Sequence, residues 1–278
     1  MSSVVIFCFA GRKENMELQL PLIRRILAEH PEAEYHVWNL ARNDEDNRYL
    51  RTIEAERITV INDFYGDDPW RRFDDVYRHY ATPEFADHLF VKVDDDVIFI
   101  ETGRFSEFIG AVDTNRDAVV SAKVVNNGAC TATEPGLWRC FEELALPLLD
   151  VHLSGGYAEM SHYYALDNWS DMIGQPLQLI PTEDWLSINL IGYDWDIGTR
   201  MASSLGTPTP SSIAGRSFSN DTRLGDEGLV NTLPRLILQG FLACHLYFGP
   251  QRQHLTDDLL ADFRKRYAVA GQLYLDSA

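Results

Sequence analysis

Three consecutive aspartates, Asp94, Asp95 and Asp96, are the residues of this chain with the clearest chemical potential. They stand between two apolar runs in the segment VKVDDDVIFI. Like charges crowded beside a buried strand repel one another and raise their pKa values unless a cation neutralises them. Carboxylate oxygens hold divalent ions, and alternate side chains of an extended backbone share a face. We therefore expect Asp94 and Asp96 to reach one ion while Asp95 points elsewhere.

A surface turn would account for the triplet more simply than a metal site. Aspartate is common in turns, so the three residues could form an acidic, solvated turn at the end of a strand. An EF-hand is excluded because Ile98 stands where that loop needs Asp or Asn, and no glycine follows. The place of the triplet after a fourth predicted strand favours a metal site.

Two further polar groups follow downstream. Asp226 and Glu227 open a predicted helix, and His245 lies in an apolar run. Taken singly, the acidic pair is explained by capping and the helix dipole. A single histidine in an apolar strand is more often a hydrogen-bonded core residue than a ligand.

The elements that must position these residues begin with an alternation of apolar and amphipathic segments over residues 1–125. Strands are predicted at residues 4–9, 35–40, 58–61 and 89–93. Helices are predicted at residues 18–30, ending before Pro31, and at residues 48–56. A further helix is predicted where aromatic residues recur at helical spacing, at Trp70, Phe73, Tyr77 and Tyr80. This alternation indicates a Rossmann-like, mostly parallel sheet flanked by helices, and ligands of such sheets gather at the carboxyl ends of the strands.

The second half of the chain is less regular. Residues 126–136 and 203–221 are rich in Asn, Ser, Thr, Gly and Pro and are predicted as loops, the second as a lid or a disordered segment. Later elements are predicted as a strand at 186–193, a helix from about Glu227, a strand at 241–248 and a helix at 257–267. The whole chain of 278 residues is interpreted as a single α/β domain.

Composition excludes several classes of function. A net charge of −18 disfavours bulk binding of nucleic acid or anionic membranes. The sequence has no GxGxxG and no GxxxxGK[ST], which argues against NAD-type cofactors and ATP-type phosphate loops. Four cysteines without a CxxC pair suggest neither a zinc site nor a disulfide framework. Residues 4–10 are too short to cross a bilayer and resemble no cleavable leader, so the expected location is the cytoplasm.

An apolar strand ending in DxD after β/α alternation resembles the GT-A glycosyltransferases, and VKVDDDVIFI is similar to the DDD motif of fringe-type and β-1,3-galactosyltransferase-like enzymes. A resemblance to bacterial and phage-encoded GT-A enzymes extends over nearly the whole chain. It is carried by CFAGRK (8–13), WNLARN (38–43), VDDD (93–96), GDE (225–227) and HLYFGPQR (245–252).

The resemblance implies a metal-dependent hexosyltransferase with a GT-A fold. Residues 1–125 would bind a nucleotide sugar, with a uridine diphosphate sugar expected, and residues 126–278 would bind the acceptor and carry out catalysis. Mn²⁺ or Mg²⁺ would bridge the two phosphates. Asp96 is the expected direct ligand, and His245 completes the metal site. Asp94 either binds the same ion or, like Asp95, contacts the ribose, a water molecule or another residue that binds the metal.

The resemblance also assigns a base and a nucleotide pocket. Glu227 is the expected base of an inverting reaction and Asp226 its supporter, although the family order of this acidic pair is reversed here. Glu183 and Asp184 are the rival base. The residues expected to border the nucleotide base and ribose are Phe9, Ala10, Arg12 and Asn43.

The acceptor is expected to face residues 126–200. Aromatic faces suit sugar rings, although the same residues could simply pack a core. The candidates are Trp138, His152, Tyr157, His162, Tyr163, Trp169, Asp184 and Trp185. Protein, glycan, small molecule and modified nucleobase all stay open as acceptors. A sugar nucleotidyltransferase and a non-catalytic nucleotide-sugar-binding protein are the alternative functions.

Overall fold

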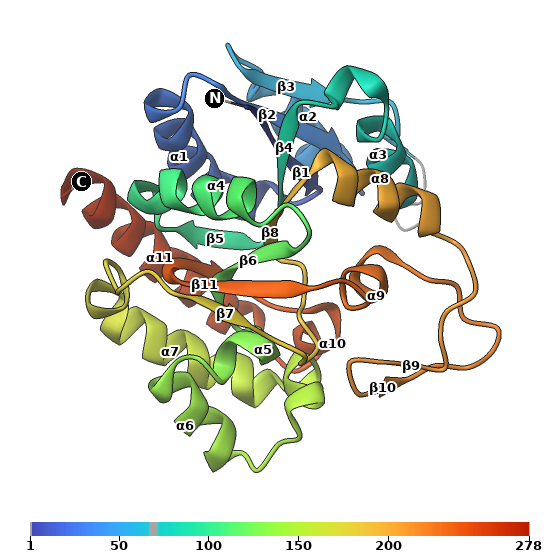
Figure 1. The fold of residues 1–278 in the computed structure, drawn as a ribbon. Coiled ribbons are helices and arrows are strands. Elements are labelled where there is room, and N and C mark those ends of the chain that lie inside the picture. The colour runs from blue at the N-terminus through green and yellow to red at the C-terminus, as the bar shows by residue number, and fades with distance from the viewer. Residues whose placement is uncertain (1, 67–71, 278) are drawn as a thin grey trace.

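The computed structural model describes residues 2–66 and 72–277 of the chain. Among these residues, nine strands form one sheet in the order β3-β2-β1-β4-β8-β6-β11-β5, with β7 beside β11 (Figure 1). Its strands are β1 (Ser3–Ala10), β2 (Ala33–Asn39), β3 (Ile58–Ile61), β4 (His88–Asp94), β5 (Val97–Ile100), β6 (Val119–Val125), β7 (Leu179–Pro181), β8 (Leu190–Asp194) and β11 (Arg235–His245).

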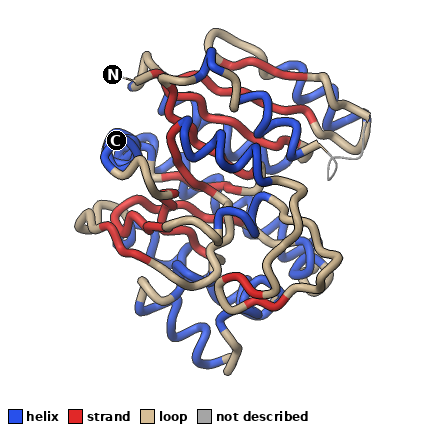
Figure 2. The backbone as a smooth tube through the Cα atoms, turned by 45° about the vertical axis from the view of Figure 1, so that its right-hand side comes forward, coloured by secondary structure: helices blue, strands red, loops and turns tan. Residues whose placement is uncertain are grey.

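Helices flank this sheet. They are α1 (Lys13–Glu29), α2 (Asp44–Thr52), α3 (Phe73–Tyr80), α4 (Phe105–Thr114), α5 (Gly128–Thr131), α6 (Pro135–Glu143), α7 (Gly155–Met172), α8 (Trp195–Ser204), α9 (Asp226–Val230), α10 (Gly249–Arg252) and α11 (Asp257–Ser277). A separate hairpin, β9 (Ser212–Ile213) and β10 (Arg216–Ser217), stands apart from the main sheet (Figure 2).

The first four strands run parallel, as the sequence predicts. β1 pairs with β2 and β4, and β2 pairs with β3. The helix predicted from residue 18 begins earlier, at Lys13, and contains Pro21. Trp70 lies outside the described residues, whereas Phe73, Tyr77 and Tyr80 belong to α3.

The second half makes the sheet mixed. β8 runs antiparallel to both neighbours, β4 and β6, while β11 runs parallel to β6 and antiparallel to β5 and β7. The strand predicted from residue 186 begins only at Leu190. The strand predicted at 241–248 begins much earlier, at Arg235, and its pairing is interrupted between Leu238 and Leu242. Gly240 lies in that interruption, where a Cβ atom would stand 2.6 Å from the Gln175 carbonyl oxygen.

One predicted loop is partly wrong. Residues 126–136 include α5 and the start of α6, because Ala129 and Cys130 are buried and pack in the core despite their polar neighbours. Residues 203–221 begin with the end of α8 and contain the β9–β10 hairpin, and the remainder forms irregular connections toward α9.

Both faces of the sheet are covered. Alternate residues of β1 belong to different clusters of buried side chains, with Val4 and Ile6 packed toward α1 and Phe7 packed toward α3. The four cysteines are free and buried, so the described residues contain no disulfide. No helix in the part of the chain that the structure describes is long and apolar enough to cross a membrane.

His162, a candidate acceptor contact, lies in this core. Its Nε2 donates to the Leu246 carbonyl oxygen at 2.7 Å, and its Nδ1 accepts from the Tyr267 hydroxyl at 2.9 Å. Both bonds fit a neutral imidazole, and burial lowers the pKa of His162 to about 4.

We therefore expect the free energy of unfolding to fall as the pH drops from about 6.5 to about 4. In that window the unfolded histidine takes up a proton that folded His162 does not, at a cost on the order of 3 kcal/mol in full. Urea unfolding between pH 7 and pH 4 measures this. His162→Gln, which keeps a donor for Leu246, should show a shallower pH dependence. An equal dependence in both proteins would contradict the assignment.

Candidate functional site

Asp94, Asp96 and His245 meet at one edge of the sheet. β4 ends at Asp94 and β11 ends at His245. Both β4 and β6 are antiparallel to β8, and β11 is parallel to β6. β4 and β11 therefore run in the same direction. Each of the three residues offers one ligand atom, and these atoms all lie within 4.8 Å of one another. We call this group the DDH cluster; it could hold a metal ion.

The donor set of the DDH cluster suits a divalent ion. Two carboxylates and one imidazole are ligands that Mn²⁺ accepts, and carboxylates suit Mg²⁺. His245 is buried with its Nε2 3.2 Å from Asp96 Oδ1, and its Nδ1 has no hydrogen-bond partner among the described residues. The backbone also holds the site, because Leu246 N–H donates to the Asp96 carbonyl oxygen at 2.8 Å.

Asp95 points away from the DDH cluster, toward the end of β1. Its carboxylate accepts from Gly11 N–H at 2.9 Å and from Arg12 Nε at 3.1 Å. The Arg12 guanidinium also lies 2.8 Å from Asp96 Oδ2. Although burial raises the pKa of Asp96, the charges of Arg12 and His245 outweigh burial and hold that pKa well below its usual range.

Asp94 has two polar neighbours that the sequence analysis did not single out. Lys92 is buried, with Nζ 2.5 Å from Asp94 Oδ1 and 2.6 Å from the Ile188 carbonyl oxygen. Asn189 Nδ2 lies 3.4 Å from Asp94 Oδ2. Burial raises the pKa of Asp94 despite the charge of Lys92. A lysine inside an apolar strand, on the same face as Asp94, was the available signal for this pair.

Glu227 and Asp226 stand at the start of α9. Glu227 Oε1 accepts from the indole N–H of Trp185 and from the Ser187 hydroxyl at 3.3 Å. Burial raises the pKa of Glu227. Asp226 accepts from the Tyr77 hydroxyl at 3.2 Å and from the Glu227 N–H at 2.8 Å, so it fixes the first turn of α9.

Residues 185–189 connect these two groups of acids. Trp185 and Ser187 donate to Glu227, and Asn189 donates to Asp94. Lys92 interacts electrostatically with Asp94 and also with Asp226 and Glu227. The segment predicted as the start of a strand therefore carries side chains to both parts of the site.

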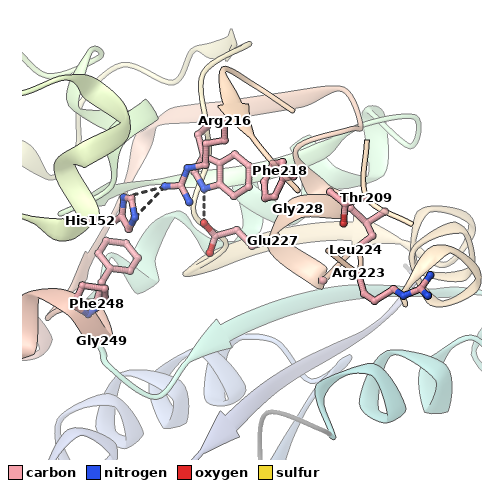
Figure 3. Close-up of a pocket in the computed structure, with 13 residues that line it drawn as sticks. His152, Thr209, Arg216, Phe218, Arg223, Leu224, Glu227, Gly228, Phe248 and Gly249 are labelled. Atoms are coloured by element: carbon pink, nitrogen blue, oxygen red, sulfur yellow. Dashed lines mark hydrogen bonds between the residues drawn. The ribbon is translucent and has the colours of Figure 1, made fainter. Parts of the chain in front are cut away.

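A pocket of about 330 Å³ adjoins Glu227 (Figure 3). Its walls include two residues expected near the acceptor, His152 and Trp185, together with others that the sequence analysis missed: Arg216, Phe218, Arg223 and Phe248. The Phe248 ring lies 4.4 Å from the His245 ring, centre to centre, so the pocket also borders the DDH cluster. We call it the Glu227 pocket.

The residues expected to border a nucleotide have varied surroundings. Arg12 belongs to the site through Asp95 and Asp96. Phe9 stacks on Phe73 at 4.5 Å, and Ala10 is fully buried. Asn43 caps α2, where its side chain accepts from the N–H groups of the first turn.

Most of the other acceptor candidates lie away from the Glu227 pocket. Tyr157 is buried and Trp169 packs near Phe99, whereas Trp138 and Tyr163 are exposed at the surface. Glu183 and Asp184, the rival base, line a neighbouring pocket of about 540 Å³. Trp185 lines both pockets.

Comparison with known proteins assigns no family to this chain. No protein-family model matches it, and a search of the curated proteins found no match.

Proposed function

We propose that this protein is a metal-dependent glycosyltransferase of the GT-A type, which transfers a sugar from a nucleotide-diphosphate sugar to an acceptor hydroxyl. One observation carries the proposal. The DDH cluster lies at the carboxyl ends of β4 and β11, and residues 185–189 form hydrogen bonds both with Glu227 and with Asp94 of this cluster. A uridine diphosphate sugar is the expected donor.

The donor half of the site uses the ends of β1, β4 and β11. Asp94, Asp96 and His245 would hold Mn²⁺ or Mg²⁺. When bound, the ion offsets the negative charge of a diphosphate and of the leaving nucleotide. Arg12 holds Asp95 and Asp96 in place through its two ion pairs. Lys92 orients Asp94 through an ion pair, and Asn189 does so through a hydrogen bond.

Glu227 would act as the base. As the acceptor oxygen bonds to the anomeric carbon, the bond from that carbon to the diphosphate breaks and its electron pair leaves with the nucleotide. The hydroxyl proton passes to the Glu227 carboxylate. A raised pKa makes this carboxylate a stronger base. Its hydrogen bonds with Trp185 and Ser187 both go to Oε1. One displacement of this kind inverts the anomeric centre.

The alternative functions predict other arrangements. A sugar nucleotidyltransferase needs free cations in the loop after the first strand. Here Arg12 is paired with Asp95 and Asp96, and Lys13 Nζ lies 3.1 Å from Glu45. A non-catalytic binding protein would need no base beside its pocket. The observed arrangement therefore favours transfer.

A screen of nucleotide sugars by thermal shift tests the proposal. We expect one donor to raise the melting temperature by several degrees, and only with Mn²⁺ or Mg²⁺, because a ligand at 100 times its Kd adds about 2.7 kcal/mol to stability. Incubation with that donor should release a nucleoside diphosphate. Release of pyrophosphate from a sugar phosphate and a nucleoside triphosphate would identify a nucleotidyltransferase, and binding without any turnover would identify a binding protein.

A further inference from the structure

The β9–β10 hairpin places a single arginine in the wall of the Glu227 pocket. Its turn contains two residues with positive φ, Ala214 at 45° and Gly215 at 82°, and Arg216 follows directly. The Arg216 guanidinium lies 4.0 Å from the centre of the Trp185 ring, and its Nη2 donates to His152 Nδ1 at 2.9 Å (Figure 3). Stacking and hydrogen bonding thus fix the planar group against the wall.

Arg216 has no carboxylate partner among the described residues, because none of their acidic oxygens lies within ion-pairing distance of its guanidinium. Glu227 and Asp150 attract Arg216 only at longer range. Several other arginines have a carboxylate partner, as Arg116 has Asp113. A partly buried guanidinium without a counter-ion is costly unless a ligand supplies the negative charge.

The pocket holds a cation on a strongly acidic protein. The chain carries a net charge of −18, yet Arg216 stands in this pocket with Glu227 as the one acid among the described residues that line it. Burial and the nearby Arg216 charge lower the pKa of His152, so the imidazole is neutral and accepts from the guanidinium. The remaining donors of Arg216 suit an anion, since guanidinium groups bind carboxylates and phosphates with two parallel hydrogen bonds.

We propose that the Glu227 pocket binds a negatively charged group, a carboxylate or a phosphate, on a hydroxylated molecule about the size of one sugar residue. Phe218 and Phe248 supply aromatic surface for the ring, while Arg216, stacked on Trp185, binds the charge. Naming this molecule as the acceptor rests on the proposed function, because only then does Glu227 act on its hydroxyl. The anion site itself does not depend on that step.

This site is distinct from the one expected for the donor diphosphate. Neither Asp94 nor Asp96 lines the pocket, and the Phe248 ring packs against both His245 and His152. Glu227 lies on the side of the pocket that faces residues 185–189. A charged acceptor would therefore present its hydroxyl beside the base while its anionic group stays at Arg216.

Calorimetric titration at constant ionic strength tests the proposal with three probes of similar size: glucuronate, glucose 6-phosphate and neutral glucose. We expect at least one charged probe to bind the wild-type protein about ten-fold more tightly than glucose or better. The tighter of the two identifies carboxylate or phosphate as the source of the charge. Arg216→Gln should remove this preference and Arg216→Lys, which keeps the charge but not the two parallel donors, should reduce it, whereas Arg116→Gln, at an arginine paired with Asp113, should leave it intact.

Equal binding of glucose and both charged probes, or an unchanged preference in both Arg216 variants, would overturn the inference. Arg216→Lys keeps the test valid if Arg216→Gln does not fold, because lysine keeps a positive charge at this position. The titration is repeated with UDP and Mn²⁺ present. Displacement of the charged probe would assign the pocket to the donor and overturn the acceptor site. If UDP and Mn²⁺ do not bind while the charged probe does, the proposed function fails and the anion site stands.

Discussion

Glu227→Gln is expected to lower the rate of sugar transfer by about 10²- to 10⁴-fold while donor binding stays unchanged, because a positioned general base contributes about that factor. Glutamine keeps an oxygen that can accept from Trp185 and Ser187, the partners of Glu227 Oε1. It cannot take the acceptor proton. Steady-state transfer assays, together with the Kd of the donor with Mn²⁺, measure the two effects separately.

The same variant should be at least as stable as the wild type at neutral pH. Burial raises the pKa of Glu227 in the folded protein, so the folded state loses stability as the pH rises through that raised pKa. A neutral glutamine removes this cost. Asp184→Asn is the matched control, since Asp184 lines the neighbouring pocket. Normal transfer in Glu227→Gln together with lost transfer in Asp184→Asn would move the base to Asp184.

Asp96→Asn is expected to weaken Mn²⁺ binding by about 100-fold or more, since the loss of even a supporting contact to a metal ligand costs 10- to 100-fold. Donor binding that depends on the metal should fall with it. Asp96 bridges His245 and Arg12, so its carboxylate contacts another member of the DDH cluster directly. Titration of Mn²⁺ measured by calorimetry checks the effect, and circular dichroism checks that the fold survives.

Asp95→Asn is the informative control for this change. It removes the same charge one residue away, but the Asp95 carboxylate faces Gly11 and Arg12 rather than His245. A much smaller loss of Mn²⁺ affinity is therefore expected. If both variants lost affinity equally, general negative charge would explain the binding and the assigned geometry would be wrong.

The first half of the fold could be predicted because its strands are continuous apolar runs between amphipathic segments. β3 has its predicted bounds, Ile58–Ile61, and β1, β2 and β4 differ from prediction only at their ends. The mixed second half could not. β8 is antiparallel between two strands, and nothing in the run from residue 186 to 193 shows where pairing starts or in which direction. Local patterns do not encode such long-range pairing.

Some residues of the site could likewise be predicted from the sequence, and others could not. The grouping of Asp94, Asp96 and His245 follows from strand ends that meet at one edge, so it could be inferred from order and spacing. Arg216 could not be singled out, because it lies in an irregular segment without periodicity. Its place depends on a turn with two positive φ values and on stacking against Trp185. Asn43 shows the opposite case, a polar residue after a strand whose side chain caps a helix.

The DDH cluster is proposed to bind a divalent ion that holds a nucleotide diphosphate. Crystals soaked with Mn²⁺ and UDP show whether it does, through the anomalous scattering of manganese. We expect a manganese peak bonded to Asp96 and within reach of Asp94 and His245, with UDP phosphate oxygens beside it. A DDH cluster without manganese, while UDP is bound elsewhere, would rule out this role.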